Sequence, residues 1–310
     1  MQPDRPYLGI LLMLGFCCAA PMGDATAKLI GAEVALSVLL FVRFFIQALV
    51  SVPISLAQGR TWRLPPRVLG LTLLRSLLHI AGIGCMFLSL RYLPLADAVA
   101  IAFVMPFIML LLGYAVLGEQ VGVRRLSACA VGFAGTLMVI QPSFALVGAP
   151  ALLPLAVAVI FALFMLVTRA VAKAADPITL QAISGVMTLP ILLPVALIAW
   201  LGAQPGADPA LYRGMIWVQL GFLGVLGTLA HLMMVWALRF APSATLAPMQ
   251  YLEIPMATLV GWLVFRDFPN GLALIGIVVT TSAGLYVIAR ERGEARRAAP
   301  LTPAVPPPPT

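Results

Sequence analysis

Polar and ionisable side chains lie deep within apolar stretches of this sequence, where an unpaired polar group is costly. Arg75 and His79 are four residues apart, so they would share one face of a helix. Glu253 lies in the middle of another apolar stretch, and Gln250 precedes it by one helical turn. A guanidinium can hold a carboxylate through two parallel hydrogen bonds, and a buried carboxyl can bind an ammonium group or load and release a proton. These side chains therefore favour a site for a small zwitterion.

A second set of polar residues lies at comparable depth in two further apolar stretches. Arg43 and Gln47 repeat the four-residue spacing, and Asp24 follows the Pro21-Met22-Gly23 break. An Asp24–Arg43 ion pair would be either a structural clamp or an outer gate, and we favour the clamp. Gln47 and the aromatic Tyr251 are candidate cavity residues.

Each of these residues also has an explanation without a ligand. Glu253 would be a protonated acid that is hydrogen-bonded between helices. Arg75 would extend to the inner membrane interface, and His79 would satisfy a backbone carbonyl. His231 is interpreted as a packed histidine. Asp97 and Lys28 are expected near the outer surface, as rim contacts of little energetic value.

Patterns typical of metal sites and enzymes are missing from the sequence. The two histidines belong to different apolar stretches, and the four cysteines lie in apolar runs without a CxxC spacing. There is no HExxH, GxSxG or P-loop motif. We therefore predict no metal, no cofactor and no enzyme activity. Proton coupling through Glu253 or His79 and facilitated diffusion are both compatible with the sequence.

The composition indicates an all-α integral membrane protein. Hydrophobic residues make up 62% of the chain and charged residues 10%, too few charges to cover a soluble domain. The apolar runs lack the alternating polarity of barrel strands, and each is long enough for a helix that crosses a bilayer. Ten such runs are present, at residues 7–28, 36–56, 68–90, 95–117, 124–141, 150–172, 180–201, 215–238, 243–265 and 271–289.

The net charge of +8 follows the predicted topology and does not indicate a nucleic-acid partner. With the N-terminus inside, most Lys and Arg residues fall in inside segments. The predicted outside segments hold four basic residues, namely Lys28, Arg91, Arg213 and Arg266. This positive-inside bias places both termini in the cytoplasm and predicts a multi-pass protein of a bacterial inner membrane.

The chain repeats itself at an offset of 148 residues. RYLPLADAVA, from Arg91, matches RFAPSATLAP, from Arg239, and further matches follow at the same offset. We predict two five-helix repeats, residues 7–141 and 150–289, followed by a disordered, cytoplasmic, Pro-rich tail at 290–310. Because five is odd, the repeats are inverted, and a substrate path should lie between them near the midplane. The polar mid-span residues are not repeated, as expected if symmetry builds the scaffold and asymmetry defines the ligand.

Prolines and small residues add two further expectations. Pro106, Pro248 and Pro255 are predicted to bend the fourth and ninth spans and to expose backbone groups to a cavity. Small residues recur every four positions in the fifth and tenth spans, which allows close helix packing in lipid. We favour packing within each half, and a homodimer surface is the alternative. The stripes are Ala128, Gly132 and Thr136, matched by Gly276, Thr280 and Gly284.

The stretches from Leu74 to Arg125 and from Ala237 to Asn270 resemble the ten-helix EamA-type branch of the drug/metabolite transporter superfamily. The resemblance rests on the LPLADA motif at 93–98, the mid-span Pro106, the LGE motif at 117–119 and the APMQY motif at 247–251. It implies two inverted five-helix repeats around a central cavity, to which the third, fourth, eighth and ninth spans contribute.

We therefore expect a secondary transporter that works by alternating access, with Gln47, Arg75, His79, Gln250, Tyr251 and Glu253 around the substrate. Export of amino acids or related small metabolites is the favoured activity. Transport of nucleosides, vitamins, sulfonium metabolites or drug-like cations is the alternative. An intramembrane enzyme or a channel is more remote.

Overall fold

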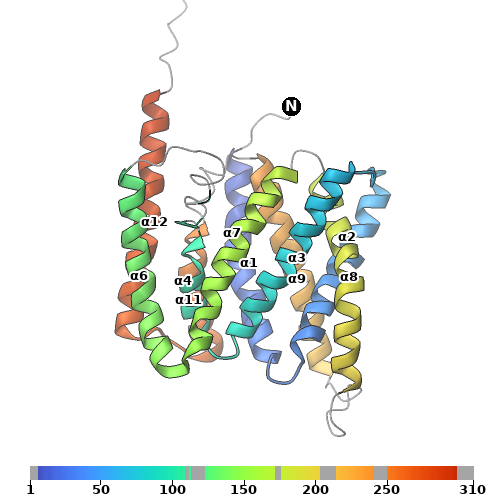
Figure 1. Cartoon of the computed structure of the whole chain (residues 1–310), viewed down its shortest axis with the longest axis horizontal. Helices are drawn as coiled ribbons and strands as arrows, with labels where there is room; N and C mark the ends of the chain where they lie inside the picture. The colour runs from blue at the N-terminus through green and yellow to red at the C-terminus, as the bar shows by residue number, and fades with distance from the viewer. Residues whose placement is uncertain are drawn as a thin grey trace, which may run out of the picture.

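The computed structural model describes residues 6–105, 107–108, 112, 123–171, 176–202, 214–240 and 250–298, and its regular elements within these ranges are all helices. Their order is α1 Pro6–Ile30, α2 Leu36–Ala57, α3 Pro66–Ser89, α4 Leu95–Ala102, α6 Val123–Val147, the 3-10 helix η1 Ala149–Leu152, α7 Leu153–Val171, α8 Pro177–Leu201, α9 Gly214–Phe240, α11 Glu253–Phe265 and α12 Gly271–Ala298. Figure 1 shows the long helices side by side across the molecule. The predicted all-α class is confirmed.

The helices expose apolar side chains where a soluble protein would expose charges. Leu49 of α2, Ile198 of α8 and Val218 of α9 are all more than half exposed. Such surfaces are stable against lipid because every helix satisfies its own backbone hydrogen bonds. Among the described residues, seven helices are long and apolar enough to cross a membrane. With α4, α11 and α12, they correspond to the ten predicted spans.

Helices α4 and α11 are shorter than the continuous spans predicted at 95–117 and 243–265. α4 ends at Ala102 and is followed by turn residues Phe103 and Val104, whereas α11 begins at Glu253. Pro106 lies four residues after Ala102 in the sequence, and a proline in that position neither donates to that carbonyl nor leaves room for it. The fourth span is thus interrupted at Phe103 and Val104, and residues 109–111, 113–122 and 241–249, which include parts of the two spans, lie outside the described residues.

The three predicted proline bends have different outcomes. Pro255 lies in the first turn of α11, and the turn residues Tyr251 and Leu252 separate this helix from the helical residue Gln250. A proline cannot donate to the carbonyl four residues earlier, here that of Tyr251, so the interruption is in keeping with the bend predicted at Pro255. Pro106 and Pro248 lie outside the described residues, so the bends predicted there stay predictions.

The pattern of helix contacts is unchanged when each helix is replaced by the equivalent helix of the other half. Helix α1 packs on α9, and the equivalent pair, α7 and α3, also packs together. The equivalent helices pack on each other in three further pairs, α2 with α8, α4 with α11, and α6 with α12. Figure 1 shows the α6–α12 pair at one edge of the bundle and α4 with α11 near its centre. The two inverted five-helix repeats are thus confirmed.

The small-residue stripes of α6 and α12 face each other across the two halves. The Thr280 hydroxyl donates to the carbonyl of Gly132 over 3.3 Å, and Thr280 and Thr136 are fully buried. A Cβ atom on Gly276 would lie 2.5 Å from the carbonyl oxygen of Gly135. The preferred prediction of packing within each half is therefore wrong, because the described part of each stripe packs on the other half. The homodimer through these stripes stays a prediction.

We expect Gly276→Ala to destabilise the protein by about 1–3 kcal/mol, since overpacking a close helix contact costs that much. The added Cβ would be too near a backbone atom, which cannot move without shifting helix α6. Thermal unfolding in detergent measures the effect. Gly271→Ala at the exposed start of the same helix meets nothing within 4 Å and is the control. Equal melting temperatures for the two variants would contradict the close packing.

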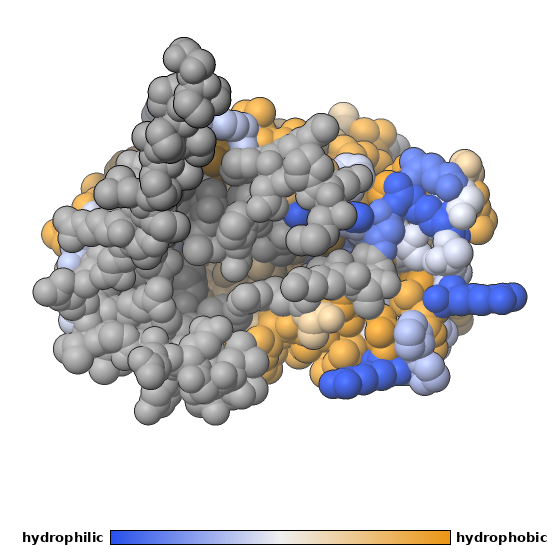
Figure 2. All heavy atoms as spheres, turned by 90° about the horizontal axis from the view of Figure 1, so that it is seen from above, coloured by the Kyte–Doolittle hydropathy of each residue, from blue (hydrophilic) through white to orange (hydrophobic). Residues whose placement is uncertain are grey.

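The end of the bundle that carries the α2–α3 loop is charged. Arg60 and Arg239 both pair with Asp176, and Arg63 and Arg67 are exposed nearby in the sequence. Figure 2 looks onto this end, where hydrophilic residues gather on the right beside apolar helix surfaces. The start of α1 and the end of α12 lie on this same side in Figure 1. That this side faces the cytoplasm stays a prediction from the positive-inside rule.

Helix α12 continues to Ala298, so the tail predicted to be disordered from residue 290 is wrong for 290–298. The segment ARERGEARRA is rich in Ala, Arg and Glu, which favour helix, and Pro300 follows it. Residues 299–310 lie outside the described residues.

Candidate functional site: a central cavity between the two halves

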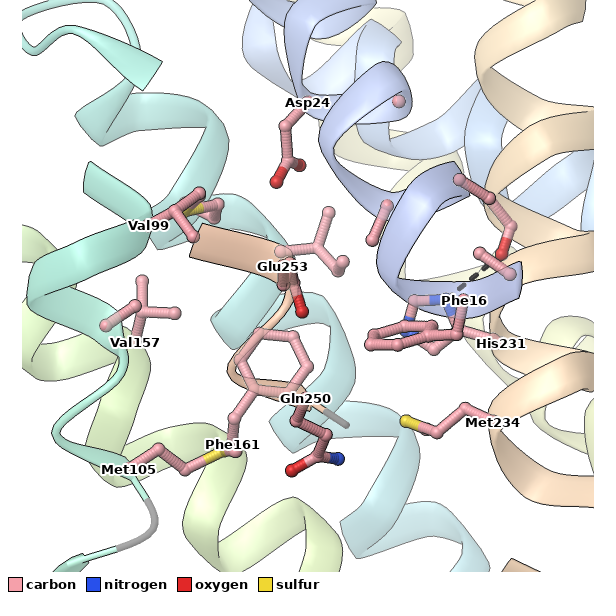
Figure 3. Close-up of a pocket in the computed structure, with 18 of the residues that line it drawn as sticks. Phe16, Asp24, Val99, Met105, Val157, Phe161, His231, Met234, Gln250 and Glu253 are labelled. Carbon is pink, nitrogen blue, oxygen red and sulfur yellow. Dashed lines mark hydrogen bonds between the residues drawn. The ribbon is translucent and has the colours of Figure 1, made fainter. Parts of the chain in front are cut away.

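A cavity lies at the centre of the bundle, and its wall is mostly apolar, with aromatic and thioether side chains among small and aliphatic ones. Helices α1, α3, α4, α7, α9 and α11 all contribute to it, and Arg43 reaches it from α2. Four phenylalanines and four methionines line it, namely Phe16, Phe87, Phe103, Phe161, Met86, Met105, Met165 and Met234. Figure 3 shows Phe16 and Phe161 on two sides of the cavity, with Met105 and Met234 at its edge. Such walls suit a flat, apolar ring system.

Two carboxyl groups, Asp24 and Glu253, enter this apolar cavity from different helices. Asp24 comes from α1, and Glu253 comes from the first turn of α11, where the helix dipole favours a negative charge. Within the described part of the chain, neither carboxyl is recorded in a hydrogen bond or an ion pair. Figure 3 shows both carboxyls in the cavity, with the Gln250 amide below Glu253. Three polar groups are thus available to a ligand.

The ion pair predicted between Asp24 and Arg43 is not formed in this structure, although both residues line the cavity. Arg43 is 2% exposed and donates to Gln47 Oε1 over 3.0 Å and to the carbonyl of Gly227 over 3.2 Å. Its Nη2 also lies 3.0 Å from His231 Nδ1. Arg43 therefore joins α2 to α9, that is, one half of the protein to the other.

Arg75 lies outside the cavity lining and uses its donors on the second half of the chain. Its Nε donates to Thr168 Oγ1 over 3.0 Å, its Nη1 to Ser184 Oγ over 2.8 Å and its Nη2 to Gln181 Oε1 over 3.1 Å. The guanidinium carbon lies 4.7 Å from the ring centroid of Phe164. Helix α3 is thereby joined to α7 and α8, so the geometry is that of a brace between the halves.

His79, Gln47 and Tyr251 are likewise buried behind the cavity lining. His79 Nε2 lies 2.9 Å from His231 Nε2, and Gln47 donates to the carbonyl of Gln181 over 3.1 Å. Tyr251 is 2% exposed, and its ring lies 5.6 Å from that of Phe103. Of the six predicted substrate contacts, the structure brings Gln250 and Glu253 to the cavity. Direct substrate contact by Arg75, His79, Gln47 and Tyr251 stays a prediction.

Sequence reasoning missed the apolar lining and the position of His231. The phenylalanines and methionines of the lining do not differ in spacing from those that pack between helices, so no sequence signal separates the two groups. His231 was interpreted as a packed histidine, yet it both lines the cavity and contacts Arg43. The sequence could not reveal the contacts of His231 with the other half, because both partners are more than 150 residues distant in the chain.

Lys28 lies on α1 one helical turn beyond Asp24, toward the predicted outer side. Its Nζ donates to the carbonyl of Leu93 over 2.7 Å and lies 3.6 Å from the carboxylate of Asp267. Asp97 accepts a hydrogen bond from Ser143 over 2.9 Å. The rim contacts predicted for Lys28 are thus present, and they join α1 to the end of α11.

The profile of the EamA-like transporter family matches residues 7–141 and 149–306. The chain belongs to this family. The match covers both repeats, so the resemblance predicted to the drug/metabolite transporter superfamily is confirmed. The protein is a multi-pass membrane transporter of that class, in agreement with the prediction of a transporter.

Named relatives of this EamA-family chain are transporters of two metabolites. A riboflavin transporter of Rhizobium johnstonii is 30% identical over 227 residues, which are 73% of this chain and 72% of the relative. An S-adenosylmethionine uptake transporter of Rickettsia bellii is 24% identical over 285 residues, which are 92% and 94% of the two chains. A solved crystal structure superposes with a TM-score of 0.60 at 18% identity, covering 94% of this chain and 100% of that chain. The last comparison shows the fold alone.

Proposed function

We propose that the protein is a bacterial inner-membrane transporter, with both termini in the cytoplasm, for uptake of a metabolite that carries a planar nitrogen-heteroaromatic ring. Riboflavin has an isoalloxazine ring and S-adenosylmethionine has an adenine ring, so one ring-binding cavity would serve either type of substrate. The names of the relatives support this class, and the name of the Rickettsia bellii relative supports the direction of uptake.

The observation that carries the proposal is the composition of the cavity wall. Phe16, Phe87, Phe103 and Phe161 offer aromatic faces, and the four methionines offer polarisable sulfur. Stacking of a nucleic-acid base on an aromatic side chain is worth about 1–3 kcal/mol, and sulfur–aromatic contacts add to it. A small aliphatic amino acid would leave most of this apolar surface unused.

The polar groups of the cavity are better suited to bind the edge of such a ring than to bind the free carboxylate of a substrate. Asp24, Glu253 and Gln250 supply acceptors and one amide donor for ring N–H and amino groups. The amino-acid exporter predicted from the sequence relied on Arg75 or His79 to hold a carboxylate. Both lie behind the lining, and the donors of Arg75 are used by Thr168, Ser184 and Gln181. The alternative prediction of a vitamin or sulfonium metabolite is therefore the better supported one.

Alternating access is supported by the interruption of two helices at the cavity. Helix α4 ends and helix α11 begins beside it, so short segments can move there without bending a long helix. The contact of Lys28 with Leu93 and Asp267 would break when the outer side opens. The two repeats would then rock about the cavity, and the brace at Arg75 would hold α3 against α7 and α8.

The test is counterflow in proteoliposomes loaded with unlabelled substrate, because counterflow needs no energy source. Radiolabelled riboflavin, S-adenosylmethionine and tryptophan are compared with liposomes that lack the protein. We expect counterflow of riboflavin or S-adenosylmethionine, at least about tenfold above tryptophan, which corresponds to about 1.4 kcal/mol. Tryptophan counterflow that exceeds both would support the amino-acid exporter predicted from the sequence. If folded protein showed no counterflow of any of the three compounds, the proposed substrate class would be refuted.

A further inference from the structure

The chain contains two histidines, and they contact each other at the boundary between the halves. His79 of α3 and His231 of α9 approach through their Nε2 atoms at 2.9 Å, with ring centroids 4.4 Å apart. His79 is fully buried and His231 is 7% exposed, at the cavity lining. Two nitrogens at this distance share one proton, because two N–H groups cannot point at each other.

The position of each proton follows from Arg43, which can only donate. Arg43 Nη2 has two hydrogens, and its two partners are the carbonyl of Gly227 at 3.2 Å and His231 Nδ1 at 3.0 Å. His231 Nδ1 must therefore accept, so neutral His231 carries its proton on Nε2 and donates it to His79 Nε2. The proton of His79 then lies on Nδ1, and that buried nitrogen has no hydrogen-bond partner among the described residues.

A carbonyl lies beside His231 that could accept a hydrogen bond if His231 bound an additional proton. The carbonyl of Gly227 lies 3.0 Å from His231 Nδ1, in the same helix and one turn earlier. If Nδ1 became protonated, it would donate to Gly227 and keep the hydrogen bond from Nε2 to His79. The same proton would end the contact with Arg43, because two donors and two positive charges would then face each other.

We propose that the His231–His79 pair is a proton-binding site of the transporter, and that a proton bound at His231 Nδ1 transfers Arg43 from His231 to Asp24. Arg43 and Asp24 both line the cavity, and this structure holds them unpaired. The charged and titratable groups on the surrounding helices are Cys17 and Asp24 of α1, Arg43 of α2, Arg75 of α3 and Glu253 of α11. Of the two acids, Asp24 is the one whose charge interacts with Arg43 in this structure, and both residues line the cavity.

The transfer links the proton to substrate access and rests on the proposed function of the cavity. With His231 neutral, Arg43 joins α2 to α9 and Asp24 is free for a ligand. With His231 protonated, Arg43 joins α2 to α1 and occupies Asp24. Proton binding would thereby compete with the substrate for Asp24, so proton and substrate would cross in opposite directions, and each substrate taken up would be exchanged for a proton that leaves.

The first experiment observes the two rings directly in the full chain. Nitrogen-15 histidine labelling gives four ring-nitrogen signals, and His79→Gln identifies those of His231. At neutral pH we expect His231 to carry its proton on Nε2, His79 on Nδ1, and a coupling between the two Nε2 atoms. A proton on Nδ1 of His231, or two rings without coupling, would overturn the arrangement. Because this measurement needs no transport, it stands even if the proposed substrates are wrong.

The second experiment compares uptake driven by an imposed pH gradient with counterflow in the same proteoliposomes. We expect the ratio of the two rates to change at least about threefold with the gradient in the wild type, and to become independent of it in His231→Gln, which removes the nitrogen that would bind the proton. Thr228→Val, on the same helix, removes a buried hydroxyl that donates to the carbonyl of Gly224 but no titratable group, so its ratio should follow the wild type. A wild type with counterflow but no gradient response, or a His231→Gln variant that keeps the response, would refute the proton site. Absence of all counterflow would refute the proposed substrates, and the nitrogen-15 measurement would still test the proton site.

Discussion

Arg75→Met is expected to remove most of the stably folded protein instead of weakening substrate binding in a folded one. Arg75 is fully buried and makes three hydrogen bonds, to Thr168, Ser184 and Gln181, at 2.8–3.1 Å. Each hydrogen bond to a charged group contributes about 1.5–3 kcal/mol, and partners left unpaired cost more. The total of about 4.5–9 kcal/mol is comparable with the whole stability of a typical protein, about 5–15 kcal/mol. Arg75→Lys should not restore stability, because an ammonium lacks the planar fork that reaches three acceptors.

Size-exclusion chromatography and thermal unfolding in detergent measure this outcome. The matched control is Arg91→Met, since Arg91 is exposed and makes one hydrogen bond, to the carbonyl of Val34. If Arg75→Met stays folded and loses substrate affinity, the original prediction that Arg75 binds the substrate would be right. The brace between the halves would then be wrong.

Glu253→Gln is expected to separate cationic from neutral substrates. The Glu253 carboxyl lies in the cavity at the start of α11 and has no partner recorded among the described residues. Removing one partner of a buried, hydrogen-bonded charge pair costs about 2–5 kcal/mol, so S-adenosylmethionine should lose at least about thirtyfold in apparent affinity. Neutral riboflavin should lose about tenfold or less, because an amide replaces one neutral hydrogen bond worth about 0.5–1.5 kcal/mol.

Concentration-dependent counterflow of both substrates provides the measurement. Glu33→Gln, in the exposed turn between α1 and α2, removes the same charge away from the cavity and should leave both affinities unchanged. Equal losses for the two substrates in Glu253→Gln would mean that the carboxyl supports the cavity wall and does not contact the charged group.

Most of the architecture could be predicted because its determinants are local in the sequence. A bilayer requires a helix of defined length, so the apolar runs predicted the spans without knowledge of their packing. The 148-residue offset predicted the two repeats, but not that equivalent helices pack on each other, as the Thr280–Gly132 contact between residues at that offset shows they do. Helix ends were less predictable. α11 begins only at Glu253, and α12 continues to Ala298, because turns and charged helix ends depend on surroundings that no run of hydropathy encodes.

The sequence by itself determined the class of this protein: a membrane transporter built from two inverted repeats, with a few polar residues at mid-span. The tertiary structure decided which of those residues face the cavity. Asp24, Gln250 and Glu253 do so, whereas Arg75 and His79 are turned toward partners on the other half. Ser184 is 109 residues from Arg75, and His231 is 152 residues from His79. Depth in the membrane follows from position along a helix, but the direction of a side chain follows from the rotation of that helix against its neighbours, which only packing decides.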